Sequence, residues 1–106
     1  MEQCQDSNGI VIQVQGDLDL LTVIKLDDKL EDTIDELRKL PDDKKLTLDL
    51  KQLDFIDSAG LALLIRVSRE LAVIDRVLRV VVGKGCQPDR VLKIGQFNRI
   101  LDLVSE

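Results

Sequence analysis

The segment Asp54–Leu61, with the sequence DFIDSAGL, places one hydroxyl group beside carboxylates and a glycine, between apolar stretches. Three chemical roles suit Ser58 in this setting. It can be a catalytic nucleophile, the N-cap of a helix, or a group that another protein modifies. Each role needs different neighbours, so the rest of the chain has to distinguish among them.

A catalytic role for Ser58 lacks its usual partners. The chain of 106 residues has no histidine, which removes the common base of serine and cysteine nucleophiles and the commonest zinc ligand. A serine–lysine pair is also missing, because the third residue after Ser58 is Leu61. Cys4 and Cys86 lie far apart, and we expect both to be reduced thiols. The sequence therefore predicts no catalytic residue, no metal and no cofactor.

Charge and hydropathy restrict the possible partners. The chain has 15 Lys and Arg against 20 Asp and Glu, a net charge of −5 that repels phosphate backbones and anionic lipid surfaces. No basic stripe with interleaved aromatics offsets this, since Phe55 and Phe97 are the only aromatic residues. The longest apolar run, near residues 61–65, is far shorter than the roughly 20 residues of a membrane span. We expect a soluble cytoplasmic protein without a leader, membrane insertion or direct nucleic-acid binding.

Alternating hydrophobicity predicts the strands. Residues 10–15 place Ile10, Ile12 and Val14 on one face, and residues 46–50 repeat the same period of two. Gly16 and Asp17 are expected to break the first strand. A third strand is predicted over Val77–Gly83, and a short last one over residues 100–104. The core should be aliphatic.

Helical periodicity falls between these strands. The predicted helix Leu20–Leu40 has an apolar face with a spacing of three or four residues, Asp19 or Thr22 as its cap and Pro41 as its end; its apolar face consists of Leu26, Leu30, Ile34 and Leu37. A largely buried helix is predicted over Leu61–Val73. A short helix should begin at Pro88, run through Ile94 and end at Gly95.

Strands that alternate with helices need crossover connections, which favour a mostly parallel sheet. The sequence thus predicts one α/β domain over residues 1–106, a small sandwich with a mostly parallel or mixed sheet covered by helices. Sites in such folds lie at the carboxyl ends of strands. Ser58 lies in one such loop and Asp19 in another.

The loop around Ser58 allows a structural and a functional interpretation. An N-cap serine accepts a backbone N–H and typically contributes ~1 kcal/mol. Ala59 and Gly60, however, give the helix start little side-chain cover, which would leave the hydroxyl and amides open to another protein. Gly60 costs ~1 kcal/mol relative to alanine in a helix, so a packing or access reason is expected.

Three stretches together resemble the STAS domain, the family of anti-sigma factor antagonists. The segment LTLDLKQLDFIDSAGLALLI (46–65) resembles its central signature, a strand followed by a hydrophobic loop, "DS", small residues and "GL". VQGDLDL (14–20) is similar to its Gly-x-Leu-Asp junction, and DRVLKIGQFNRILDLV (89–104) to its closing helix, turn and strand.

The resemblance implies a regulatory role for Ser58. In that family an anti-sigma factor that is also a serine kinase phosphorylates the serine of the "DS" motif, the unphosphorylated antagonist binds this kinase and frees sigma, and a metal-dependent serine phosphatase resets the cycle. By position Ser58 is the phosphorylated residue, and Asp19, Asp57, Ala59 and Gly60 border the partner surface. The more apolar sequence after Asp19, LLTVIK, suggests that this surface differs here.

Two alternatives remain open. A STAS domain can serve as an adaptor of a transporter or a stress-signalling assembly without being phosphorylated. A small serine hydrolase that uses Ser58 is the alternative from another class, and the missing histidine disfavours it.

The glycines of VGKGCQ (82–87) lack the spacing of a P-loop and indicate a tight turn.

Overall fold

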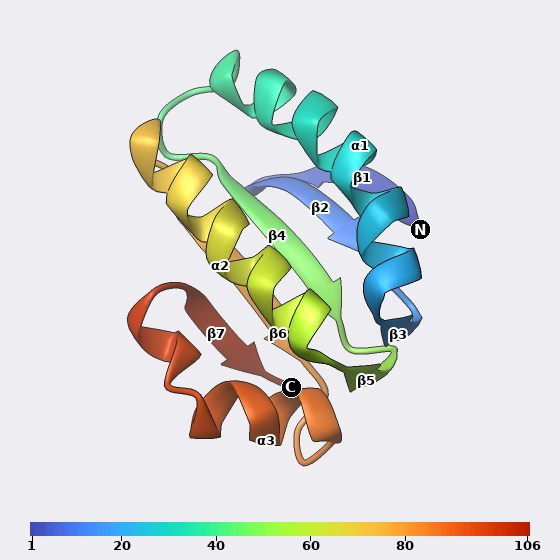
Figure 1. Cartoon of the computed structure of the whole chain (residues 1–106). Helices are drawn as coiled ribbons and strands as arrows, with labels where there is room; N and C mark the ends of the chain where they lie inside the picture. Colours follow the sequence, from blue (N-terminus) through green and yellow to red (C-terminus); the bar gives the residue numbers. More distant parts are fainter.

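The computed structural model describes residues 1–106 and has a mixed α/β fold (Figure 1). In chain order its elements are β1 (Glu2–Asp6), β2 (Gly9–Gln13), β3 (Gly16–Leu18), α1 (Leu20–Arg38), β4 (Lys45–Leu50), β5 (Leu53–Ile56), α2 (Ser58–Val73), β6 (Leu78–Val82), α3 (Gln87–Ile94), a 3-10 turn η1 (Phe97–Arg99) and β7 (Asp102–Ser105).

The main sheet has five strands in the order β1-β2-β4-β6-β7. Only β1 and β2 pair antiparallel, as a local hairpin, and the other neighbours pair parallel. A second sheet consists of β3 and β5 alone, which are parallel. The predicted mostly parallel, mixed sheet is therefore confirmed.

The helices α1 and α2 run side by side across one face of the main sheet (Figure 1). Ile10 and Ile12 of β2 and the leucines of β4 point toward them and are fully buried. The alternating residues, among them Val11, Thr47 and Arg79, line a shallow depression on the opposite face. The two long helices thus cover only one face of the sheet.

The core is aliphatic, as predicted. Phe97 is its only aromatic residue, while Phe55 is 45% exposed. The apolar face predicted for the first helix is also confirmed, because its four residues are all buried. Thr33 is buried with them, and its hydroxyl donates to the Lys29 carbonyl (2.8 Å) within the same helix and lies 3.1 Å from the side-chain oxygen of Gln3 on β1.

Three strands were missed by the sequence analysis. β1 is largely exposed and polar, so it has no apolar alternation to detect. β3 begins at Gly16, where the sequence predicts only the end of the preceding strand, and β5 lies where the sequence predicts a loop. The helix predicted over Leu61–Val73 begins earlier, at Ser58, and is amphipathic rather than largely buried.

Candidate functional site

Two strand-to-helix junctions meet at the small β3–β5 sheet. The strands are parallel and in register at their ends, with Leu18 opposite Ile56. The next residues, Asp19 and Asp57, are therefore equivalent in position, and each is the N-cap of the following helix. The Asp57 amide also donates to the Leu18 carbonyl (3.3 Å), which ties one junction to the other. The structure thus brings together the two loops that the sequence marked.

Asp57 caps α2, so the interpretation of Ser58 as the N-cap is wrong. The Asp57 carboxylate accepts the amide hydrogens of Ala59 (2.9 Å) and Gly60 (3.1 Å). Ser58 is instead the first residue of the helix and is exposed. Because the carboxylate already accepts two of the free amides of the first turn, the cap does not need the Ser58 hydroxyl.

Asp19 caps α1, one of the two possibilities that the sequence allowed. Its carboxylate accepts the backbone N–H of Thr22 (3.1 Å) and the Thr22 hydroxyl (3.2 Å). The Thr22 backbone N–H is the main reason that the pKa of Asp19 lies below its usual 3.8. Asp19 is therefore ionised at neutral pH and contributes a fixed negative charge to the junction.

Gly60 is buried, in contrast to the expected open helix start. A Cβ atom at this position would lie 2.7 Å from the Leu18 carbonyl oxygen and 2.7 Å from Cγ1 of Ile56. Ordinary contacts between carbon atoms are about 3.5 Å or longer, so no larger side chain fits without movement. Gly60 lets the first turn of α2 approach β3 and β5, while Ala59 is half-buried and Ser58 forms the surface.

Gln87, the first residue of α3, contacts the same site and was missed by the sequence analysis. Its side-chain Oε1 accepts the amide hydrogen of Ile56 (2.9 Å), and its Nε2 donates to the Ile56 carbonyl (3.0 Å). The two residues are 31 positions apart. No local pattern in the sequence signals such a contact.

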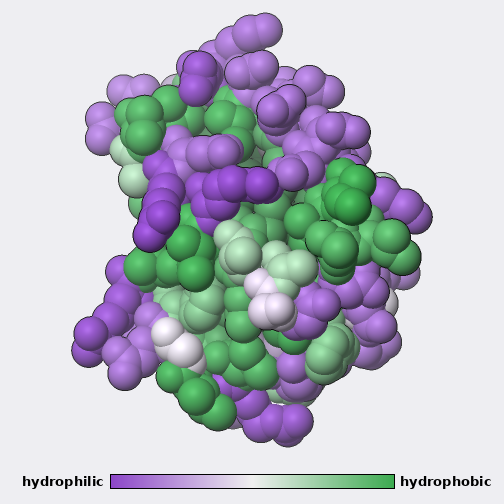
Figure 2. Space-filling view, viewed as in Figure 1, coloured by the Kyte–Doolittle hydropathy of each residue, from purple (hydrophilic) through white to green (hydrophobic).

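Exposed apolar side chains lie on the segments that border the junctions. Leu20, Leu21 and Ile24 in the first turns of α1 are 61%, 71% and 58% exposed. Phe55 precedes the junction on β5. Figure 2 shows apolar surface in several areas of this face of the molecule, interrupted by polar side chains. Leu20, Leu21, Ile24 and Phe55 are called the apolar rim below. The first three belong to the apolar segment after Asp19, whose side chains are therefore exposed on the surface.

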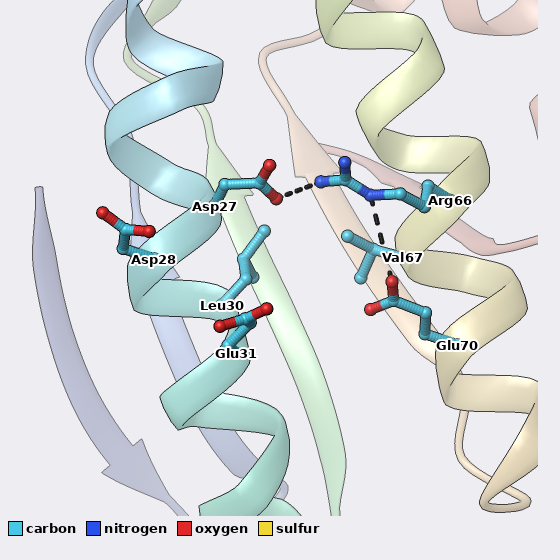
Figure 3. A pocket seen from close by; sticks show the side chains of 7 residues that line it. All are labelled: Asp27, Asp28, Leu30, Glu31, Arg66, Val67 and Glu70. Atoms are coloured by element: carbon cyan, nitrogen blue, oxygen red, sulfur yellow. Dashed lines mark hydrogen bonds and ion pairs between the residues drawn. The ribbon is translucent and has the colours of Figure 1, made fainter.

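A separate depression lies between α1 and α2 (Figure 3). Arg66 of α2 forms an ion pair with Asp27 of α1 and a longer one with Glu70 (3.9 Å). Leu30 and Val67 form its floor, and the remaining lining residues are acidic. The paired side chains are about half exposed, so the pairs contribute at most about 1 kcal/mol each. The Arg66–Asp27 pair joins the two helices. The depression lies farther along α2 than Ser58, which is the first residue of that helix.

Both cysteines are free thiols, as expected. The Cys86 thiol donates to the Gly83 carbonyl (2.8 Å) in the turn before α3. None of the helices combines the length and apolarity that crossing a bilayer requires.

The arrangement defines a class of protein, a small α/β domain with an exposed serine at the start of a capped helix. The family model of the STAS domain matches residues 2–106, so the chain belongs to the STAS domain family. The resemblance noted in the sequence is confirmed.

Solved structures share this fold. One, from Thermotoga maritima, is described as a candidate anti-sigma factor antagonist; it superposes with a TM-score of 0.80 at 14% identity, over 99% of this chain and 85% of that chain. Another is the anti-sigma factor antagonist SpoIIAA in its unphosphorylated form, with a TM-score of 0.73 at 17% identity, over 99% of this chain and 86% of that chain. At these identities the similarity establishes the fold.

Proposed function

We propose that this protein is an anti-sigma factor antagonist whose binding is switched off by phosphorylation of Ser58. The unphosphorylated form binds an anti-sigma factor serine kinase in the cytoplasm and thereby releases the sigma factor. A metal-dependent serine phosphatase removes the phosphate. The protein itself acts as a binding module and a kinase substrate, not as an enzyme. Membership of the STAS family and the names of the two similar structures support this role.

The observation that carries the proposal is that Asp57 caps α2 while the neighbouring Ser58 is exposed. Asp57 makes both capping hydrogen bonds, so modification of the neighbouring hydroxyl leaves the cap in place. Ser58 is exposed and fixed on a helix. In the phosphorylation step its oxygen bonds to the γ-phosphorus of ATP while the bond to ADP breaks, and the hydroxyl proton passes to a base of the kinase.

The charges around Ser58 explain how one phosphate can end binding. A phosphate adds about −1.5 to −2 charges. Asp54 and Asp57 already lie within residues 53–61, which include no lysine or arginine. At ~6 Å and an effective dielectric of ~20, repulsion between the phosphate and a carboxylate of the partner is on the order of a few kcal/mol before screening. The helix N-terminus returns only ~0.3–1 kcal/mol, so repulsion dominates in a tight interface.

The partner surface comprises Ser58, Ala59 and the two capping aspartates, together with the apolar rim. Gly60 is excluded from the proposed contact residues because it is buried. Burial of an apolar side chain contributes ~1.5–3 kcal/mol, so the rim provides binding energy while Ser58 provides control. A phosphate held beside the rim would have to lose water on binding, which adds to the repulsion.

Two alternatives make different predictions. An adaptor that is never phosphorylated would bind its assembly equally with and without ATP. A serine hydrolase would require a base at the Ser58 hydroxyl, and the chain contains no histidine to provide one. A serine-reactive phosphonate should therefore leave the protein unlabelled.

The test is a binding titration against a candidate anti-sigma factor serine kinase from the same source, using wild type, Ser58→Ala and Ser58→Asp. Wild type and Ser58→Ala should bind without ATP, and Ser58→Asp should bind at least tenfold more weakly, which corresponds to 1.4 kcal/mol. ATP should weaken only wild type, with one phosphate on Ser58 by mass spectrometry. Ser7→Asp is the matched control, because Ser7 is exposed in the β1–β2 turn and gains the same charge away from the junctions.

Equal binding by all variants, with no phosphate on Ser58 after ATP addition, would refute the switch and favour the constitutive adaptor. Weakened binding by Ser7→Asp as well would show that net charge, rather than the position of the charge, determines the affinity.

A further inference from the structure

One edge of β5 has no neighbouring strand. β5 pairs only with β3, so the main-chain groups on its other edge need partners from elsewhere. Ile56 is 2% exposed, and buried amide and carbonyl groups without partners are costly. The side-chain amide of Gln87 supplies both partners, since it accepts from the Ile56 N–H (2.9 Å) and donates to the Ile56 C=O (3.0 Å).

The Gln87 amide thus takes the place of a third strand at Ile56. Two hydrogen bonds to one residue fix the position of its peptide groups more firmly than a single bond would. On the opposite side the Asp57 amide donates to the Leu18 carbonyl (3.3 Å). Residues 56 and 57 are therefore held from both sides immediately before Ser58.

Gln87 is itself held by a well-anchored helix start. Pro88 and Asp89, the next residues of α3, are buried. The Asp89 carboxylate accepts hydrogen bonds from the Gly85 amide (2.9 Å) and the Ser105 hydroxyl (2.6 Å) and pairs with Lys93 (3.0 Å). These contacts join α3 to β7, so the Gln87 amide is presented from a rigid part of the fold.

We propose that Gln87 is a positioning residue for Ser58. It acts through Ile56 and Asp57 and does not touch the reacting atoms. The inference rests on the proposed function in that Ser58 is taken as the phosphoryl acceptor. Misplacement of a reacting group by about 1 Å can cost about 10²-fold in rate, so loosening the segment before Ser58 should slow its phosphorylation.

The first arm of the test needs no kinase. Amide hydrogen exchange is measured by NMR for wild type, Gln87→Met and Gln87→Glu. Methionine has a similar length and makes neither bond, whereas glutamate keeps the acceptor and loses the donor. Exchange at Ile56 should rise about tenfold in Gln87→Met and less in Gln87→Glu. Gln52→Met is the matched control, because Gln52 is exposed in the turn before β5.

The second arm measures phosphorylation by the cognate serine kinase at a temperature where all variants are folded. kcat on Gln87→Met should fall about tenfold, and Gln52→Met should match wild type. A general loss of stability in a still-folded protein would not change kcat, so kcat separates positioning from a purely structural role.

The outcomes separate the inference from the proposed function. Unchanged exchange at Ile56 in both Gln87 variants overturns the inference, whatever the kinase does. Increased exchange with an unchanged kcat shows that the contact is structural and overturns the positioning role. Wild type that gains no phosphate on Ser58 overturns the proposed function, and with it the assignment of Ser58 as the acceptor.

Discussion

Replacement of Gly60 by alanine sets two opposing effects against each other. Gly60 is the third residue of α2, and alanine is favoured over glycine in a helix by about 1 kcal/mol. The new Cβ, however, would lie 2.7 Å from the Leu18 carbonyl oxygen, a backbone atom at the end of β3. Relief of this contact requires α2 to move away from β3. Overpacking of this kind typically costs about 1–3 kcal/mol, so after the gain in helix propensity we expect a net loss of up to about 2 kcal/mol.

Urea denaturation measures this balance. With a slope of about 2 kcal/mol/M, which is typical of a small protein, the midpoint of Gly60→Ala should fall by up to about 1 M at unchanged slope. Ala62→Gly is the control, since Ala62 is exposed on the same helix and its replacement should cost about 1 kcal/mol through helix propensity alone. A Gly60→Ala protein that is more stable than wild type by about 1 kcal/mol would refute the close approach of α2 to β3.

Two further predictions concern buried charged side chains. The Ser105 hydroxyl and the Gly85 amide lower the pKa of Asp89 from 3.8 to about 2. The contribution of the ionised Asp89 carboxylate to the free energy of unfolding is therefore complete above about pH 4 and is lost as the pH falls toward 2. Asp89→Asn should lower stability at pH 7 by about 2 kcal/mol. In thermal melts, the melting temperature of this variant should change less between pH 4 and 2 than that of wild type. Arg76, 7% exposed, donates to two backbone carbonyls, and Arg76→Ala should cost about 2–3 kcal/mol in urea denaturation.

Each of these variants has an exposed control. Asp54→Asn removes the same charge as Asp89→Asn, but from an exposed side chain. Arg99→Ala likewise removes an exposed arginine, in contrast to the buried Arg76. A steep loss of stability between pH 4 and 2 in Asp89→Asn would point to other carboxylates as its cause. A cost below about 0.5 kcal/mol for Arg76→Ala would mean that water replaces the two carbonyl contacts.

The long periodic elements were predictable from the sequence because burial repeats with the period of the structure. Leu26 and Leu30 are buried where the helical spacing placed them, and Ile10 and Ile12 where the strand alternation did. β3 and β5 were not predictable in the same way. They have three and four residues and pair only with each other, so their formation depends on the rest of the fold.

The candidate site was located by its motif, but its internal contacts were not predictable. Aspartate and serine are both good N-caps, so local preference cannot choose between Asp57 and Ser58. The choice depends on where α2 begins, and the close approach of Gly60 to β3, which leaves no room for a Cβ beside the Leu18 carbonyl, is visible only in the folded chain. The Gln87 contact joins residues far apart in the sequence, and only the folded chain brings them together.

The connectivity of the main sheet bears on when during folding Ser58 can be recognised by a partner. Apart from the β1–β2 hairpin, every strand pair joins segments separated by a helix, so these contacts close long stretches of chain. Domains rich in such distant contacts fold slowly compared with helical bundles, and an isolated hairpin has little stability of its own. The groups that hold Ser58 come from Leu18, Ile56 and Gln87, in three separate parts of the chain. A short peptide with the sequence DFIDSAGL would lack two of them, so Ser58 is presented as a tertiary epitope that exists only after folding is complete.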